Sequence, residues 1–129
     1  MPASGSYLLD TNIVIHLLNR DEVVVAQIRD ASEILIPIIA IGELFFGASK
    51  SSRPKENKIR IEELAAQNSV LLCDFEVARE YGEIKQELRA LGKPIPENDI
   101  WIAAIAKALG TLPGDPRPAL SRNSAIGDS

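Results

Sequence analysis

The chain has 129 residues, a formal net charge of −4 and a hydrophobic fraction of 46%, a composition typical of a globular protein with one core. Its single cysteine, Cys73, excludes an internal disulfide and fits a reducing compartment. No apolar run reaches the roughly 18 residues that span a bilayer, and residues 1–6 lack the pattern of a secretory signal. We therefore expect a cytoplasmic, single-domain protein without a membrane segment. The negative charge disfavours binding of nucleic acid by charge alone, although an acidic metal pocket is negative as well.

Short apolar runs alternate with amphipathic runs along the chain. Residues 7–10 predict a buried strand, and a helix follows that begins near Thr11 or Asn12, either of which can cap it. The other expected elements are, in chain order, a helix over 21–31, a strand over 33–39 that Pro37 ends, helices over 40–51 and 53–68, a strand over 69–74, a helix over 75–92 that Gly92 ends, and a helix over 99–110 that Gly110 ends. Strands that alternate with helices imply an α/β fold in which helices cover both faces of a parallel sheet.

Three carboxylates stand in apolar surroundings. Asp10 follows the first strand directly, at the edge where parallel sheets bind ligands, but a simple helix cap explains it equally well. Glu43 lies among core residues of a helix and shares a face with the small residues Ala40 and Gly47; a solvent-facing position is its simpler interpretation. Asp99 lies in the first turn of an apolar helix, where unpaired N–H groups stabilise a carboxylate whether or not it has a further role.

The three carboxylates are more informative together than one by one. Carboxylates brought within a few Å repel one another, and protonation or a bound cation relieves the repulsion. Mg²⁺ and Mn²⁺ are hard ions that accept a few carboxylates plus water. Such an ion lowers the pKa of bound water and stabilises charge on a phosphoryl oxygen. The pattern therefore predicts metal-assisted hydrolysis of a phosphodiester.

Three motifs carry a resemblance to a known family: YLLDTN at 7–12, IAIGELFFGA at 39–48 and PENDIWIAA at 96–104. In order and spacing they resemble the PIN-domain ribonucleases, and most closely the VapC-type toxins of bacterial toxin–antitoxin pairs. The segments SRPKENK at 52–58 and AREYGEIKQELRALGKPIPEND at 78–99 are similar to the same subfamily. The resemblance implies a PIN-like three-layer α/β/α sandwich with a central, mostly parallel sheet. It implies a single domain over 1–129, of which 6–110 is family-like.

The resemblance also implies an activity and a set of roles. It implies a Mg²⁺- or Mn²⁺-dependent endoribonuclease that cuts RNA and so inhibits translation. By motif position, Asp10, Glu43 and Asp99 are its catalytic acids. The metal is held chiefly by Asp10 and Asp99, while Glu43 orients the waters of the metal or acts as a base. Thr11 and Asn12 would support the acid cluster, and the expected partners are a second copy of the chain and a VapB-like antitoxin.

The stretch after Gly110 departs from the family pattern. Family members usually continue with a strand and a segment like TLATRDxHF, which supplies a fourth acid or an Asn, whereas this chain reads GTLPGDPRPALSRNSAIGDS. One choice of codons for 110–124, read one base later, gives APFLATRDPHFHEI. We therefore hypothesise a frameshifted tail over 111–129, in which loss of the last strand exposes a sheet edge and activity is impaired. Gene sequencing tests this, because codons incompatible with that frame contradict it.

Other interpretations compete with the nuclease. The second hypothesis is a catalytically impaired PIN-like module that dimerises and binds an antitoxin without cleaving RNA. A phosphatase with an aspartyl nucleophile is disfavoured, because that chemistry prefers a second Asp where Asn12 stands. His16 is more typical of a polar helix residue than of a general base, and Trp101 of core packing than of base stacking. The basic stretch over 50–60 either meets an RNA backbone or forms a solvated helix face, and we favour the solvated face.

Overall fold

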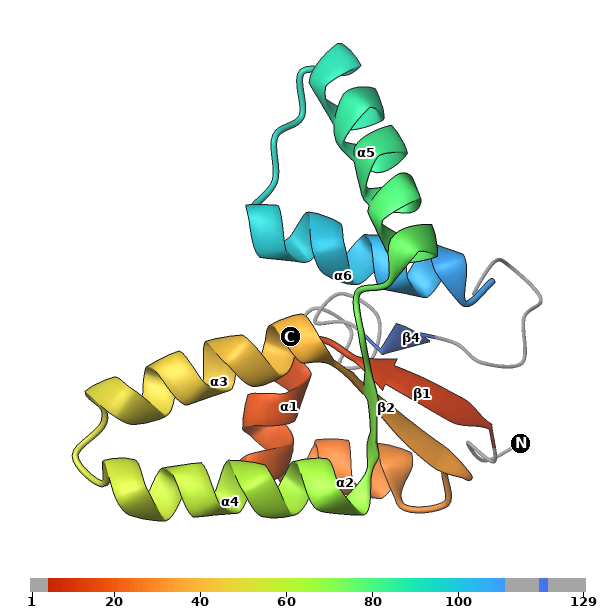
Figure 1. The fold of residues 1–129 in the computed structure, drawn as a ribbon. Coiled ribbons are helices and arrows are strands. Elements are labelled where there is room, and N and C mark those ends of the chain that lie inside the picture. Colours follow the sequence, from red (N-terminus) through yellow and green to blue (C-terminus); the bar gives the residue numbers. More distant parts are fainter. Residues whose placement is uncertain (1–4, 111–118, 121–129) are drawn as a thin grey trace.

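The structure is a computed structural model that describes residues 5–110 and 119–120. In this part of the chain a parallel sheet carries helices on both faces (Figure 1). The elements in chain order are β1 (Ser6–Leu9), α1 (Thr11–Leu18), α2 (Glu22–Ile28), β2 (Glu33–Pro37), α3 (Ile38–Lys50), α4 (Pro54–Gln67), β3 (Ser69–Leu71), α5 (Phe75–Ala90), α6 (Glu97–Ala108) and β4 (Ala119–Leu120). None of the helices in the described ranges is long and apolar enough to cross a membrane.

The strands lie in the order β3–β2–β1–β4, and every pair is parallel. Tyr7 of β1 is in register with Ile34 of β2, and Ile36 of β2 with Val70 of β3. Parallel strands place their carboxyl ends at one edge of the sheet, which is where ligands bind in folds of this kind. The chain leaves β1 at this edge through Asp10, so the fold positions that carboxylate for binding.

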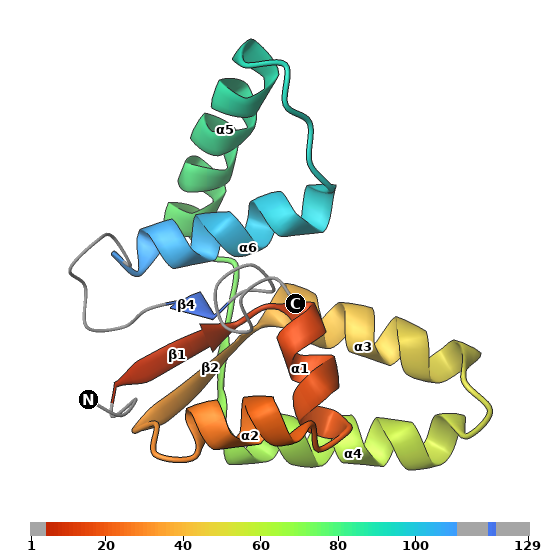
Figure 2. The same cartoon turned by 180° about the vertical axis from the view of Figure 1, so that it is seen from behind.

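Neighbouring residues of the two central strands point to opposite faces of the sheet and so divide the core into two. Leu9 and Ile36 belong to a larger cluster with residues of α1, α2, α3 and α4. Leu8 and Leu35 belong to a smaller cluster with residues of α5 and α6. The layers are visible from both sides of the molecule, with α5 and α6 projecting beyond the sheet (Figures 1 and 2). The expected α/β/α sandwich is confirmed.

Several local expectations need correction. Residues 38 and 39, expected in the second strand, already belong to α3, because β2 ends at Pro37. Neither Thr11 nor Asn12 caps α1, because the side chain of Asp10 accepts the hydrogen bond that a cap accepts. The third strand is shorter than expected and ends at Leu71, while the last helix begins two residues early, at Glu97. Glu97 enters the helix because the backbone of Pro96, at φ −55° and ψ 144°, already takes the conformation of an N-cap.

The expectation that the last strand is lost is wrong for residues 119 and 120. Ala119 and Leu120 form β4, in register with Leu8 and Leu9 of β1, so the outer edge of β1 is paired there. Backbone groups form these ladders, so the pairing does not need the side chains of the family motif. The frameshift hypothesis for 111–129 concerns residues that, apart from 119 and 120, lie outside the described ranges.

Candidate active site

The first site residue, Asp10, lies between β1 and α1. Its backbone is extended, with φ −85° and ψ 175°, and its Oδ1 accepts a hydrogen bond from the backbone N–H of Ile13 at 3.0 Å. The side chain is half-buried. The helix cap that the sequence offered as the simpler explanation is therefore present. A carboxylate that caps a helix is held in a fixed orientation beside the positive helix end, which also suits a charged group in a binding site.

Glu43 connects the two sides of the site. The hydroxyl of Thr11 donates a hydrogen bond to Oε1 of Glu43, and Nδ2 of Asn98 donates one to Oε2 at 2.8 Å. Glu43 is half-buried, so it is not the solvent-facing helix residue of the simpler interpretation. Because Thr11 follows Asp10 and Asn98 precedes Asp99, these two bonds bring the segments that carry all three predicted acids to one carboxylate.

Asn98 is the functional residue that the sequence reasoning missed. The sequence placed it beside Asp99 in the first turn of a helix but gave it no partner. Its bond to Glu43 spans 55 positions of the chain, so only the fold could reveal it. The available signal was an amide side chain next to a candidate acid, since Asn is a common partner for a carboxylate oxygen.

A polar network holds the first turn of α6 against α5. The hydroxyl of Tyr81 donates to Oε1 of Glu97, and Nζ of Lys85 lies 2.9 Å from Oε2 of the same carboxylate and 3.1 Å from the Tyr81 oxygen. The ring of Tyr81 stacks on Trp101, with centroids 3.9 Å apart. Asn98 and Asp99 lie between Glu97 and Trp101 in the chain, so this network fixes the segment that carries them.

The same network moves two pKa values in opposite directions. The hydrogen bond from Tyr81, and then the one from Lys85, lowers the pKa of Glu97 below its usual value. The hydrogen bond to Glu97, and then the one with Tyr81, raises the pKa of Lys85. Both shifts favour the charged forms, so the pair stays ionised around neutral pH.

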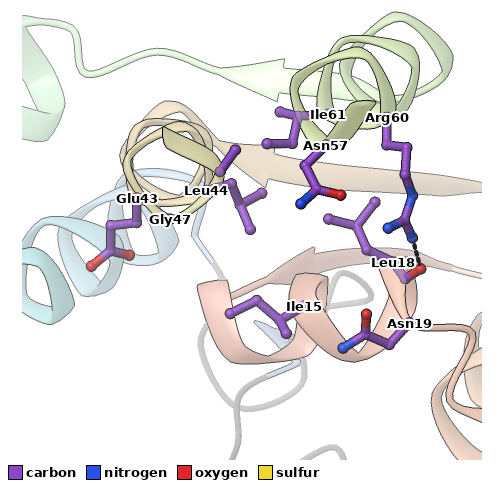
Figure 3. A pocket seen from close by; sticks show the side chains of 10 residues that line it. Ile15, Leu18, Asn19, Glu43, Leu44, Gly47, Asn57, Arg60 and Ile61 are labelled. Atoms are coloured by element: carbon purple, nitrogen blue, oxygen red, sulfur yellow. Dashed lines mark hydrogen bonds between the residues drawn. The ribbon is translucent and has the colours of Figure 1, made fainter. Parts of the chain in front are cut away.

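A groove of about 240 Å³ lies beside Glu43, between α1, α3 and α4 (Figure 3). Its walls are largely apolar, with Ile15, Leu44 and Ile61 among them, and Arg60 lies at the opposite side from Glu43. Gly47, one turn after Glu43, has no atom within 4 Å of the place that a Cβ would take. Of the two small residues expected to leave room beside Glu43, Gly47 lines this groove, whereas Ala40 is fully buried in the core.

The other sequence candidates lie on or beside α1, α4 and α6. Asn12 and His16 are exposed on α1, and Nδ1 of His16 lies 3.3 Å from a carboxylate oxygen of Asp21. Trp101 is half-buried and packs on Tyr81, in agreement with the core role. Within the basic stretch, Arg53 pairs with Glu56 on the surface of α4 at 3.3 Å.

A divalent cation such as Mg²⁺ needs oxygen ligands, which the carboxylates of this site can supply. Within residues 5–110 and 119–120, no group of three or more His, Cys, Asp or Glu side chains is arranged to hold a metal ion. Mg²⁺ does not require such a group, because it is commonly bound by one or two carboxylates and completes its shell with water and substrate phosphate. Asp10 and Asp99 are carboxylates of the right chemistry, and both are half-buried beside helix N-termini. The residues present therefore fit the ion in type.

A parallel α/β sandwich in which Glu43 joins the segments of Asp10 and Asp99 defines the class of protein. The sequence profile described as "PIN domain" matches residues 7–112. Ribonuclease VapC2 of Haemophilus influenzae is 38% identical over 108 residues, 82% of each chain. The tRNA(fMet)-specific endonuclease VapC of Shigella flexneri is 31% identical over 108 residues, also 82% of each chain. Among solved structures, the DNA-bound VapBC of Salmonella typhimurium matches with a TM-score of 0.80 and 27% identity, covering 98% of this chain and 92% of that one. The chain belongs to the VapC ribonucleases of the PIN domain family.

Proposed function

We propose that this chain is the toxin of a toxin–antitoxin pair, an endoribonuclease that hydrolyses phosphodiester bonds of RNA and so inhibits translation in the cytoplasm. The observation that carries the proposal is the position of Glu43, which accepts hydrogen bonds from Thr11 and from Asn98. These bonds join the chain segments of Asp10 and Asp99 at one point. The relatives named ribonuclease and endonuclease support the same activity.

The protein groups divide the work of the reaction between them. Asp10 and Asp99 would hold a Mg²⁺ or Mn²⁺ ion, which supplies charge stabilisation at the phosphoryl group and a more acidic water when bound. Glu43 is held at both oxygens by neutral donors, Thr11 and Asn98, so it stays fixed without a counter-charge that would cancel its negative charge. A carboxylate held in this way can orient a water molecule or accept its proton. The first turns of α1 and α6 add positive helix ends that stabilise the acids.

The relatives support an antitoxin as one partner of the chain. The structure of VapBC from Salmonella typhimurium, a complex by its name, matches nearly the whole of this chain. We propose that a VapB-like antitoxin binds and inhibits this protein, and that the active form is a homodimer. The impaired binding module is not favoured, because the relatives are named ribonuclease and endonuclease. The tail on which that hypothesis rests lies outside the described residues, apart from 119 and 120.

The experiment that tests the function is cleavage of a labelled RNA by the purified chain with Mg²⁺. Asp99→Asn should lower the cleavage rate by about 100-fold or more, since a metal-holding carboxylate supplies several kcal/mol at the transition state. The matched control is Asp21→Asn, because Asp21 also lies at a helix N-terminus, where it accepts hydrogen bonds from Val23 and Val24. RNA cleavage that survives Asp99→Asn, or that Asp21→Asn reduces equally, would contradict the assignment.

A further inference from the structure

A cavity of about 380 Å³ lies between the first turn of α6, the end of α5 and residues 91–96. Leu88, Ile95 and Ile100 give it an apolar floor, while Arg89 and Lys93 line its rim. Glu97 and Ile100 line it from α6, and Asn98 and Asp99 lie between them in the chain. The cavity and one of the proposed catalytic acids, Asp99, therefore share one helical turn.

The backbone folds back at the end of α5, next to Arg89 and Lys93. The N–H of Gly92 bonds to the carbonyl of Arg89 at 3.1 Å, and the N–H of Lys93 to the carbonyl of Leu88 at 2.9 Å. Gly92 has φ 67°, the left-handed conformation that ends a helix in this way. The chain thus turns back on the helix, and Lys93 returns toward the last turn of α5, which carries Arg89.

Charged residues of α5 and of the loop after it lie near both ends of α6. Glu80 and Glu83 lie 3.3 and 3.9 Å from Lys107, near the C-terminal end of α6. The basic residues Lys85, Arg89 and Lys93 instead line the cavity at its N-terminal end. The protein is acidic as a whole, with a net charge of −4, so a basic rim beside the proposed acids is a local departure from its overall charge.

The cations of the rim differ in what they contact. Lys85 is paired with Glu97 at 2.9 Å. In the described part of the chain, Arg89 and Lys93 have no ion pair, and both side chains are exposed. Because Glu97 is occupied by Lys85 and Tyr81, it leaves the positive charge of Arg89 and Lys93 uncompensated.

We propose that Arg89 and Lys93 bind consecutive backbone phosphates of the single-stranded RNA that the candidate active site cleaves, with one nucleotide covering the apolar floor. The inference rests on the proposed function and adds a substrate subsite to it. Arginine suits phosphate because its planar fork donates two parallel hydrogen bonds, and lysine adds a compact charge. A cavity of this size is within the range of small-ligand sites, and every base offers an apolar face to such a floor.

The test uses the full chain and a fluorescein-labelled, mixed-sequence single-stranded RNA of about 12 nucleotides, within the size that such proteins cover. Binding is followed by fluorescence anisotropy in EDTA over a range of salt concentrations, and cleavage is followed separately with Mg²⁺. For single-stranded nucleic acid, the logarithm of the binding constant falls with the logarithm of the salt concentration, with a slope of about 0.7 per phosphate contact. At about 0.1 M salt, each contact therefore contributes about fivefold to the affinity. The double variant R89E/K93E should bind the RNA at least about tenfold more weakly, with a shallower dependence on salt. R89Q/K93Q should weaken binding in the same direction with no reversed charge.

The matched control is K55E/K58E, which makes the same change in net charge at two exposed lysines of α4. It should bind RNA as the unmodified chain does. Equal weakening by both pairs would overturn the subsite, because net charge alone would then explain it. Unchanged binding by R89E/K93E would overturn it as well. A change in the oligomeric state of R89E/K93E, measured by sedimentation velocity, would also overturn it, because the cavity would then be a contact between two copies of the chain. Binding that depends on Arg89 and Lys93 in a chain that cleaves no RNA would support the subsite while the proposed function fails.

Discussion

The two helices that follow β1 and β3 begin in the same way and differ in what surrounds the first turn. Asp10 caps α1 and Asp74 caps α5, and in each case Oδ1 accepts the backbone N–H three residues later at 3.0 Å. Asp10 is half-buried, and the residue after it donates to Glu43. Asp74 is exposed, and Phe75 after it is 79% exposed.

Comparing Asp10 with Asp74 distinguishes the role of a helix cap from a role in catalysis. A helix cap explains both aspartates equally well, so the presence of a cap says nothing about a further role. What distinguishes Asp10 is the set of groups that distant parts of the chain bring to its neighbours, namely Glu43 from α3 and Asn98 from α6. Asparagine caps a helix about as well as aspartate but carries no charge, so Asp→Asn variants remove one role and keep the other.

The largest expected effect is the loss of RNA cleavage when the metal is removed, because Asp10 is proposed to hold a metal and Asp74 is not. EDTA should reduce RNA cleavage by about 1,000-fold or more, because a bound cation supplies several kcal/mol of transition-state stabilisation. Excess Mg²⁺ or Mn²⁺ should restore it. The measurement is the cleavage rate before chelation, after it and after metal is returned.

A binding assay extends this prediction without relying on activity. Mg²⁺ should raise the melting temperature of the unmodified protein and of Asp74→Asn, because an ion that binds only the folded state stabilises it. It should not raise that of Asp10→Asn. Cleavage that proceeds unchanged in EDTA would rule out the metal-dependent mechanism.

The next effect concerns the donors that hold Glu43. Thr11→Val and Asn98→Ala should each lower RNA cleavage by about 10-fold, since groups that orient a catalytic carboxylate typically contribute 10- to 100-fold. Thr11→Ser should recover most of the activity, because it keeps the hydroxyl. Both comparisons are made on kcat and KM of the same RNA.

The control for Asn98 is Asn68→Ala, at the residue that follows α4. Nδ2 of Asn68 donates to the backbone carbonyl of Leu64 at 2.9 Å, so this variant also loses one amide hydrogen bond. It should lose stability without losing activity. If Asn68→Ala and Asn98→Ala slow cleavage to the same degree, the effect is one of stability and the bond to Glu43 has no special role.

Replacing either capping aspartate with alanine should lower stability by the same modest amount. This effect is smaller than the changes in cleavage rate predicted above. Asp10→Ala and Asp74→Ala should each lower the free energy of unfolding by about 1 kcal/mol, the usual contribution of a cap, while the asparagine variants should change it little. Urea denaturation of the four variants measures this. A much larger loss for Asp10→Asn than for Asp74→Asn would mean that the charge of Asp10 stabilises the fold.

The smallest expected effect is the contribution of Glu97 to the pH dependence of the free energy of unfolding. The hydrogen bond from Tyr81, and then that from Lys85, keeps the pKa of Glu97 below its usual value in the folded state. The stabilisation is therefore present above the pKa of unfolded Glu97 and is lost as the pH falls through the lower folded value. The gap in stability between the unmodified protein and Glu97→Gln should shrink from pH 6 to pH 3 in urea titrations. The gap should be small because the pair is exposed, and a gap that widens in acid would contradict the direction of the shift.

Local patterns predicted the elements of this fold well. The alternation of apolar runs and amphipathic runs is enough to place β1, β2 and the helices, because burial on one face or both leaves a periodic trace in the sequence. The boundaries were less predictable: Asp10 and Thr11 are both good caps, and backbone geometry alone decides between them. The pairing of Ala119 and Leu120 with β1 leaves no side-chain signal at all.

The site could be predicted only in part. Each of the three acids stands out in the sequence by its apolar surroundings, but their mutual arrangement is a property of the tertiary fold. The bond between Asn98 and Glu43 and the network of Tyr81, Lys85 and Glu97 join residues of different helices. A single sequence carries no periodic signal for such contacts, which is why these partners appeared only in the structure.

The most direct test of the account is a paired measurement on Asp10→Asn and Asp74→Asn. Both variants keep a residue that caps its helix, so both should unfold within about 0.5 kcal/mol of the unmodified protein. The account predicts that Asp10→Asn loses RNA cleavage by about 100-fold or more while Asp74→Asn cleaves at the normal rate. Equal cleavage by the two variants would contradict it, because Asp10 would then be a helix cap and nothing more.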